Sequence, residues 1–486
     1  MILYRTLIWL AFAPVSAAFV VSGAEGSAEW QSLFNGRDLS NWDTWLGPRP
    51  EASDDSSERT SPIGLNTDPL GVFSVVGVDG APAIRISGQV FGALTTREEY
   101  GNVHIRAEYK WGEKKWPPRH QARHYRDSGI LYWCVGRHGA GSGAWMRSVE
   151  CNIMERGVGQ WWSVAGTYCD VEGRRVTLEL EPSIPYRGER PGERVILWQP
   201  GGPTVVARVS DGVTSPLDPE RPHGQWNLCE VIAWGHTALH LLNGRVVLAL
   251  TNPRYAQGGR ETPLRRGKVQ IQSEGAEVFY RKIAVRTLAQ VPGELWGHVP
   301  GGKDDESGFQ PLFGKTADDG WKQCGPGHFT LTNGVATGVG GMGLWWHTNR
   351  MFTNFVLRGE WVQEGDIADS GVFMRFPDPG NDPWVAVHKG HEMEIGDPAP
   401  QDPTWRTGSI YPFAAAVTTA CVKPYGQWNH YEIICDGQNY SVRINGQLVT
   451  MWTDPQQRSR AGYIGLQNYD DGKTVRHRNL RIRELP

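Results

Sequence analysis

This chain of 486 residues lacks an excess of either charge. It has 49 lysines and arginines and 52 aspartates and glutamates, so the formal net charge is −3. Charged residues make up only 21% of the total. Proteins that bind nucleic acids concentrate basic residues on one face, and this sequence has no such basic stripe. We therefore expect no nucleic-acid partner.

Helical periodicity is scarce, and after the N-terminal region no segment is apolar enough to span a bilayer. Residues 1–24 contain one basic residue, Arg5, then an apolar run and small residues, which is typical of a secretory signal peptide. A single membrane anchor is the alternative interpretation, because the run could be stretched to about 17 residues. We predict a periplasmic or secreted protein that has no membrane contact after signal cleavage.

Cysteine is also sparse, with 7 residues, no CxxC pair and no His–Cys spacing suited to a metal. Export would permit disulfides, and neighbouring strands could pair Cys421 with Cys435 or Cys134 with Cys151. No cofactor is evident. Scattered carboxylates leave open whether a divalent cation such as Ca²⁺ binds.

Tryptophan, glycine and proline are abundant, with 22, 60 and 32 residues. Apolar and polar residues alternate between Gly, Pro, Asn and Asp positions, which predicts many short strands. Asn243-Gly244 and Asn445-Gly446 are typical hairpin turns. Without helices to cover a parallel sheet, antiparallel sheets must stack, so we expect an all-β fold of jelly-roll sandwiches.

The chain contains the same pattern twice, with six matching blocks in the same order. The pairs are SLFNGRDLSNW (32–42) with PLFGKTADDGW (311–321), RDSGILYW (126–133) with ADSGVFMR (368–375), ECNIME (150–155) with EMEIGD (392–397), GQWNLCEVI (224–232) with GQWNHYEII (426–434), LNGRVV (242–247) with INGQLV (444–449), and residues 267–288 with residues 462–485.

We predict a first domain over residues 29–288, a linker over 289–308 that is rich in Pro, Gly and charge, and a second domain over 309–486. The first copy is longer, chiefly through residues 171–213, which we interpret as extra hairpins that wall or cover a groove.

These blocks resemble the bacterial 3-keto-disaccharide hydrolase family. The resemblance rests on LFNGRDLSNW, DSGILYW, SVECNIME and VFYRKIAVRTL in the first copy and on DSGVFMRF, HEMEIGD, INGQLV and YIGLQNYDDGKTVRHRNLRI in the second. It implies two tandem concanavalin-like domains and a carbohydrate ligand, an oligosaccharide or glycoside. It also implies cleavage of sugars whose C3 hydroxyl is already a ketone, by removal of the C2 proton, elimination at C1 and hydration.

Acidic residues in ECNIME and EMEIGD are the candidates for this chemistry. In a strand, residues i and i+2 share a face, so Glu150 lies beside Asn152 and Glu392 beside Glu394. The last acid of each block would face the other way unless a bulge re-aims it. Neighbouring carboxylates couple, which raises one pKa, although a solvated outer face is the alternative. The predicted catalytic residues are Glu150, Glu155, Glu392, Glu394, Asp397 and Arg375.

The resemblance favours the second copy as the catalytic one. The family shows Arg or His after the DSG block, and Arg375 satisfies this whereas Trp133 does not. Gln160 stands in the first copy where close relatives have Asp. Arg375 would hold the ketone or enolate oxygen.

Indole rings suit the C–H faces of pyranose sugars, and turn-forming acids and a histidine could add hydrogen bonds. The predicted substrate-binding residues are Trp133, Trp145, Trp161, Trp162, Trp345, Trp346, Trp384, Asp127, Asp369 and His388.

Two other functions remain open at this stage. A retaining endo-glucanase is one, because ECNIME is similar to the Glu-x-Asp-x-x-Glu strand of concanavalin-type glycosidases, which needs carboxyls about 5 to 5.5 Å apart. A non-catalytic tandem carbohydrate-binding protein is the other, because linked weak sites raise avidity.

Overall fold

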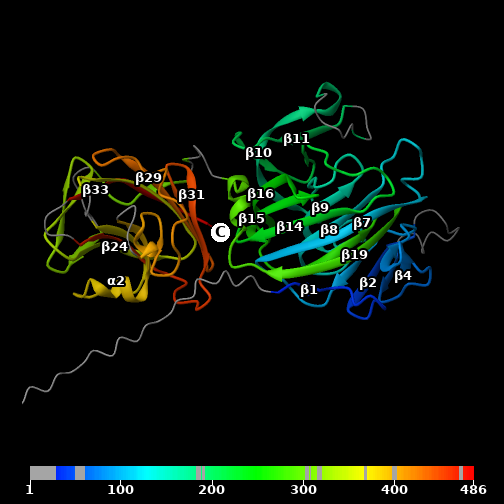
Figure 1. The fold of residues 1–486 in the computed structure, drawn as a ribbon, viewed down its shortest axis with the longest axis horizontal. Coiled ribbons are helices and arrows are strands. Elements are labelled where there is room, and N and C mark those ends of the chain that lie inside the picture. The colour runs from blue at the N-terminus through cyan, green and yellow to red at the C-terminus, as the bar shows by residue number, and fades with distance from the viewer. Residues whose placement is uncertain are drawn as a thin grey trace, which may run out of the picture.

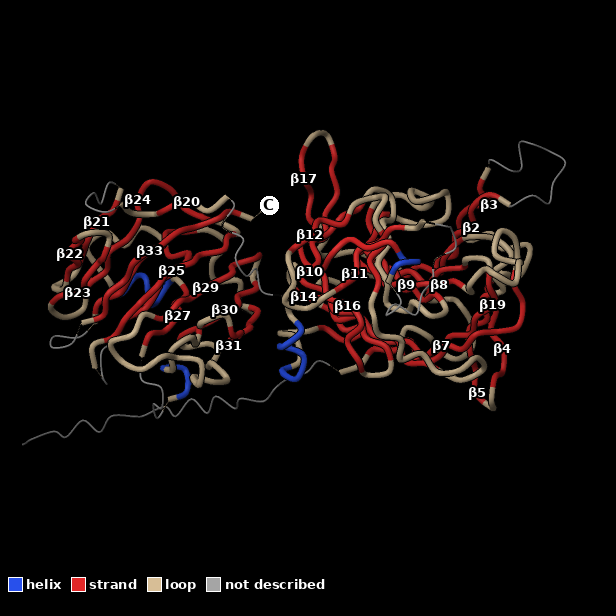
Figure 2. Tube along the Cα trace, turned by 90° about the horizontal axis from the view of Figure 1, so that it is seen from above, coloured by secondary structure: helices blue, strands red, loops and turns tan. Residues whose placement is uncertain are grey.

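The computed structural model describes residues 29–49, 61–181, 188, 192–300, 306, 308–314, 320–365, 369–396, 402–469 and 474–485. The predicted signal peptide, residues 1–24, lies outside these ranges. Within them, no helix is long and apolar enough to cross a membrane. The helices in these ranges are short (Figure 2): η1 (Leu178–Leu180), η2 (Gly293–His298), α2 (Trp384–Lys389) and η3 (Pro403–Trp405).

Each half of the chain forms two sheets that pack face to face, and the two sandwiches lie side by side (Figure 1). Strand β33 (Val475–Glu484) shows why the sheets pack in this way. Buried and partly exposed residues alternate along it on both sides of one irregularity. One face of each sheet is apolar and must be covered by the other sheet. The predicted fold of two tandem concanavalin-like jelly-roll sandwiches is confirmed.

The first sandwich pairs a sheet of 13 strands with one of 6, and among the pairs of its described residues only β11 and β13 run parallel. The larger sheet runs β13 (Gly212–Thr214), β11 (Arg194–Trp198), β10 (Thr167–Thr177), β16 (Arg245–Gln257), β15 (Thr237–Leu242), β14 (Asn227–Trp234), β7 (Val103–Lys115), β19 (Ala276–Thr287), β5 (Ala81–Ile86), β4 (Phe73–Val78), with β1 (Gln31–Ser32), β12 (Thr204–Ala207) and β17 (Arg260–Pro263) at its sides. The smaller sheet runs β3 (Pro62–Leu65), β2 (Trp42–Pro48), β6 (Gly92–Thr96), β18 (Lys268–Ser273), β8 (Asp127–Val135), β9 (Arg147–Met154).

The second sandwich pairs a sheet of 8 strands with one of 6. The larger sheet runs β22 (His328–Thr332), β23 (Val335–Val339), β33, β25 (Phe355–Gln363), β29 (Asn429–Asp436), β30 (Asn439–Ile444), β31 (Gln447–Thr453), with β20 (Gln310–Pro311) beside β33. The smaller sheet runs β21 (Trp321–Cys324), β24 (Gly343–Phe352), β32 (Gly462–Asn468), β26 (Ser370–Phe376), β27 (His391–Ile395), β28 (Ile410–Tyr411).

The repeated sequence blocks occupy equivalent strands. β8 and β9 of the first sandwich correspond to β26 and β27 of the second, and β18 corresponds to β32. The extra hairpins of the first copy are β10 to β13, which extend the larger sheet. Asn243 and Asn445 have φ angles of 49° and 50° and precede glycines with positive φ, as the hairpin prediction requires.

A bulge interrupts β8 and β26 at the same place. Trp133 and Arg375 have φ angles of 52° and 55°, and the pairing register shifts around each of them. A bulge breaks the alternation of side chains, so residues after it no longer follow the two-residue period.

Arg375 is consequently a core residue, and its catalytic role stays a prediction. Its side chain is fully buried and donates to the Thr353 carbonyl (2.7 Å), the Gly437 carbonyl (2.5 Å) and the Tyr440 hydroxyl (3.0 Å). Tyr440 belongs to the opposite sheet, so the guanidinium joins the two layers of the second sandwich and does not reach the outer face where a substrate would bind.

Polar contacts join the two sandwiches. Asp436 forms an ion pair with Arg265 and lies 3.3 Å from Nδ1 of His236, and Asn102 donates to the Asn439 side chain (2.7 Å). Asp436 is buried. Burial lowers the pKa of His236 to about 3.

All seven cysteines are free thiols, so the two disulfides considered above do not form. Cys134 packs with Trp145 outside the main core, whereas Cys151 lies in the core between the sheets. The sulfur of Cys151 lies 3.7 Å from that of Cys229 on the opposite sheet. Cys435 is buried with its sulfur beside Met374 rather than Cys421.

Replacing Arg375 with leucine should lower the thermal stability of the second sandwich. The change leaves buried carbonyl and hydroxyl oxygens without a donor, which costs roughly 3 kcal/mol or more. The matched control is Arg350→Leu, because Arg350 forms an exposed ion pair with Glu484 and such pairs contribute about 1 kcal/mol or less. Calorimetry of the full chain measures both. Equal melting temperatures for the two variants would contradict the structural role.

Candidate functional site

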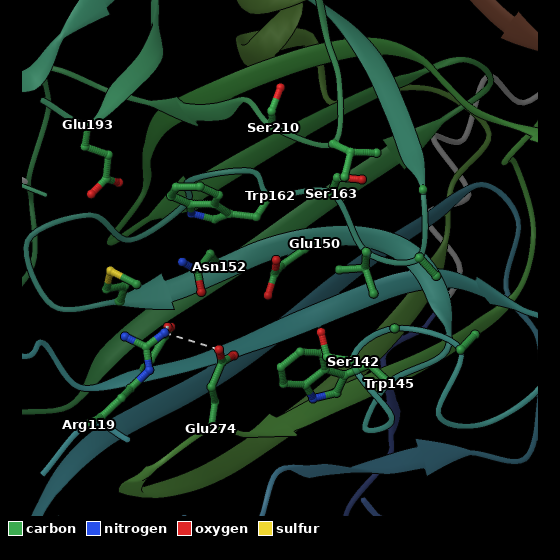
Figure 3. A pocket seen from close by; sticks show the side chains of 18 of the residues that line it. Arg119, Ser142, Trp145, Glu150, Asn152, Trp162, Ser163, Glu193, Ser210 and Glu274 are labelled. Carbon is green, nitrogen blue, oxygen red and sulfur yellow. Dashed lines mark hydrogen bonds and ion pairs between the residues drawn. The ribbon is translucent and has the colours of Figure 1, made fainter. Parts of the chain in front are cut away.

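A cavity of about 860 Å³ opens on the outer face of the six-stranded sheet of the first sandwich. Val149, Cys151 and Ile153 of β9 point into the core. The alternate residues, Glu150 and Asn152, therefore line the cavity (Figure 3). The shared face predicted for these two residues is confirmed.

Two of the predicted tryptophans form walls of this cavity. Trp145 is held by a hydrogen bond from its Nε1 to the Gly92 carbonyl (3.1 Å). Trp162 donates to the side chain of Gln160 (3.2 Å), which itself donates to Thr214 (2.9 Å). Gln160, which stands where close relatives have Asp, thus positions the indole ring of Trp162.

The inserted hairpins form another wall, as predicted. Glu193 and Arg194 at the start of β11 and Val209 and Ser210 before β13 line the cavity opposite the sheet. Gly212 is required here, because a Cβ atom at this position would lie 2.6 Å from the ring of Trp162.

Glu150 is only 5% exposed, although it lines a cavity. Burial raises the pKa of its carboxyl, and the nearby charge of Glu274 raises it further. A hydrogen bond from Gln272 (2.7 Å) and the charge of Arg119 lower it in part. The resulting pKa of Glu150 is about 8. Glu150 therefore carries a proton at neutral pH and can donate it.

Arg119 links two further acids at the cavity. Its guanidinium forms ion pairs with Asp127 and with Glu274 (3.2 Å), and Figure 3 shows the second of these beside Glu150 and Asn152. The Arg119 and Glu274 side chains are 14% and 13% exposed. The cavity thus contains the Glu150 carboxyl beside two further acids, Asp127 and Glu274, that share the positive charge of Arg119.

Glu155 does not join this group. It follows the end of β9 and accepts hydrogen bonds from the backbone (2.8 Å) and the guanidinium (2.8 Å) of Arg126. These bonds fold Glu155 back toward the segment before β8, and it does not line the cavity. Its catalytic role stays a prediction that this placement does not support.

The second sandwich places Glu392 and Glu394 of β27 near Asp369. Glu392 and Glu394 are 3% and 6% exposed. Burial raises the pKa of both well above the usual range, and the charge of Asp369 adds to this. Asp397 lies outside the described residues.

The predicted tryptophans divide between core and surface. Trp384 of α2 is 39% exposed, and His388 stacks on its ring at 6.0 Å. Three others are core residues, at most 1% exposed: Trp133, Trp161 and Trp345. Trp346, 4% exposed, instead packs with Phe373 and Ala386 on the outer face of the second sandwich. The role of these residues in substrate binding stays a prediction. Trp133, Trp161 and Trp345 fill the sandwiches because a large apolar ring stabilises a core most when it is fully buried.

Sequence reasoning missed Arg119 and Glu274. Arg119 lies in the segment between β7 and β8, outside all six repeated blocks. Glu274 directly follows β18 and lies in the repeated block 267–288, where the second copy has Tyr469. The difference between an acid in one copy and an aromatic residue in the other, at the end of a repeated strand, could have indicated Glu274 as a site residue.

No group of three or more His, Cys, Asp or Glu side chains suited to a metal ion occurs among the described residues. Arg119 supplies a positive charge at the cavity of the first sandwich.

The fold and this cavity define a concanavalin-like protein with a polar ligand site on the outer face of one sheet. The family model of the 3-keto-alpha-glucoside-1,2-lyase-like domain matches residues 29–286 and 308–483, and the chain belongs to this family, with two tandem copies. It is a carbohydrate-active protein of the hydrolase-like type.

Solved structures give more distant similarities. Two proteins of Parabacteroides distasonis ATCC 8503 that carry the provisional name glycosyl hydrolase share 26% and 19% identity. The matches cover 36% and 39% of this chain and 99% of each of those chains, with TM-scores of 0.31 and 0.32. The carbohydrate-binding module CBM66 of Bacillus subtilis shares 13% identity over 34% of this chain and 96% of its own, with a TM-score of 0.27. No curated protein matches the chain.

The raised pKa of Glu150 predicts a pH-dependent loss of stability. The folded protein holds this proton up to about pH 8, whereas an exposed glutamate releases it near 4.5. Its contribution is thus fully present below pH 4.5 and is lost as the pH rises to about 8. The free energy of unfolding of Glu150→Gln should therefore exceed that of the wild type increasingly across this window, by up to about 5 kcal/mol at its upper end. The variant should accordingly melt at a higher temperature than the wild type as the pH rises.

Melting temperatures of both proteins from pH 5 to 9 measure this difference. Glu98→Gln is the control, because Glu98 is exposed. Parallel curves for Glu150→Gln and the wild type would show that Glu150 is ionised at neutral pH.

Proposed function

We propose that the first sandwich cleaves the glycosidic bond of 3-keto glycosides by elimination and hydration. The observation that carries the proposal is the arrangement of Glu150, Glu274 and Arg119 at one cavity of ligand size. This placement differs from the expectation from the sequence, which favoured the second copy.

The reaction needs a base, an acid and a stabilising positive charge. A ketone at C3 makes the C2 hydrogen acidic, so a carboxylate can remove it and the electron pair moves to the C3 oxygen. The enolate then re-forms the ketone, a C1=C2 double bond forms and the C1–O bond breaks. The departing oxygen takes a proton. Water next adds its oxygen to C1 and a proton to C2, which completes a net hydrolysis.

Each role fits one residue at the cavity. Glu274 is the base that accepts the C2 proton. Glu150, which is protonated at neutral pH, gives its proton to the departing oxygen. Arg119 stabilises the negative charge on the C3 oxygen.

Binding of the sugar follows from the remaining walls. Trp145 and Trp162 offer ring faces to the C–H groups of the pyranose. The side-chain oxygen of Asn152 has no hydrogen-bond partner within the described part of the chain. A sugar hydroxyl could donate to it, since buried polar groups are normally paired.

A pair of chromogenic substrates tests the reaction class. The protein should release nitrophenol from 4-nitrophenyl 3-keto-α-glucoside and not from 4-nitrophenyl α-glucoside, because only the ketone makes the C2 hydrogen acidic. Nitrophenol absorbance follows both reactions. Cleavage of only the unoxidised compound would instead support a direct glycosidase, and binding without any cleavage would support a carbohydrate-binding protein.

Glutamine substitutions test which copy is catalytic. Glu150→Gln should lower kcat/KM on a 3-keto disaccharide, whose departing alkoxide needs a proton, by roughly 100-fold or more, the usual contribution of a general acid. The matched substitution in the second copy, Glu392→Gln, should lower it by less than about tenfold. The opposite order of effects would move catalysis to the second sandwich.

A further inference from the structure

The second sandwich carries two exposed tryptophans, one on each of two short helices beside β27. Trp384 lies on α2 and is 39% exposed, and Trp405 lies on η3 and is 51% exposed. All other tryptophans in the described ranges are buried or partly buried. Exposed indole rings are costly in water and commonly mark a binding surface.

Both helices are fixed against the strand that carries the two acids. Ala386 of α2 packs with Phe373 and Phe376 of β26 on the outer face of the sheet. On the other side, a Cβ atom at Gly396 would lie 2.6 Å from the Trp405 carbonyl and 3.0 Å from the Glu394 carboxyl. Glu394 therefore lies close to η3, and Glu392 pairs in register with Phe373 beneath α2. The acids lie between the two helices.

A third aromatic ring extends this surface. Tyr469 directly follows β32, is 44% exposed, and meets Trp384 edge-to-face at 6.0 Å. Tyr469 occupies the place of Glu274 in the first copy. The second copy thus has an aromatic ring where the first has its proposed base.

The two glutamates are suited to sugar hydroxyls. Burial raises the pKa of both carboxyls, which favours their neutral forms, and a neutral carboxyl can donate as well as accept. Glu392 Oε1 has no hydrogen-bond partner within the described ranges, and the side chain is 3% exposed. A ligand with hydroxyl groups can supply the missing donor, since buried polar groups are normally paired.

We propose that the second sandwich is a non-catalytic binding site for an unoxidised pyranose chain, formed by Trp384, Trp405 and Tyr469 around Glu392 and Glu394. Indole faces stack on the C–H faces of successive sugar rings, and the carboxyls bond the hydroxyls between them. This site extends the proposed function of the first sandwich but uses separate residues.

Titration calorimetry of the full chain with maltohexaose and with cellohexaose tests the site. Trp405→Ala and Trp384→Ala should each weaken binding of the preferred hexasaccharide by roughly tenfold or more. Tyr425→Ala is the control, because Tyr425 is an exposed aromatic residue (46%) in the turn before β29 of the other sheet. Trp384→Phe retains a ring at α2 and should weaken binding less than Trp384→Ala.

Unchanged affinity in both tryptophan-to-alanine variants would overturn the proposal, as would equal loss in the Tyr425 variant or no binding of either sugar to the wild type. Melting temperatures near that of the wild type show that the variants are folded. If Trp384→Ala does not fold, the affinities of Trp405→Ala and Trp384→Phe decide. The assay involves no bond cleavage, so its result does not depend on whether the first sandwich is an enzyme.

Discussion

The alternation of side chains along β9 and β27 is the constraint on which both candidate sites depend. In each strand, apolar residues point between the sheets and acids point outward, so the packing of the core fixes the direction of the carboxyls. A slip of one residue in either strand would move the acids into the core. The sites are therefore held by the same contacts that stabilise the sandwiches.

The surroundings of these carboxyls then decide what each copy can do. In the first copy, Arg119 brings a positive charge to the cavity and the inserted hairpins enclose it. In the second copy, Glu392, Glu394 and Asp369 lie together, and aromatic rings lie at the rim. One scaffold thus carries a site suited to charge development and another suited to neutral hydroxyl groups.

The repeats allowed much of the fold to be predicted, because strand periodicity and Asn-Gly turns are local properties of the sequence. The shared face of Glu150 and Asn152 followed from the same periodicity. The side chain of Arg375 was predicted to face the substrate, but a bulge at this residue turns it into the core. No residue type marks such a bulge uniquely, since the first copy has Trp133 at the same position.

The tryptophans show a second limit. Composition indicates aromatic surfaces, but only the packing of two sheets decides which rings lie inside, and Trp345 and Trp384 look alike in sequence. Arg119 was missed for a similar reason. It reaches the cavity from a connecting segment, and the direction of such a segment depends on contacts far away along the chain.

The junction between the sandwiches has a consequence for how a polymer would be handled. Asp436 is buried there beside Arg265 and His236, so pulling the copies apart would break its ion pair with Arg265. The junction would therefore keep a constant distance between the proposed binding site of the second sandwich and the proposed catalytic site of the first. A long glycan bound at the second sandwich would then be cleaved at a set number of sugar units from the bound end. The lengths of the fragments would depend on the distance that the junction fixes.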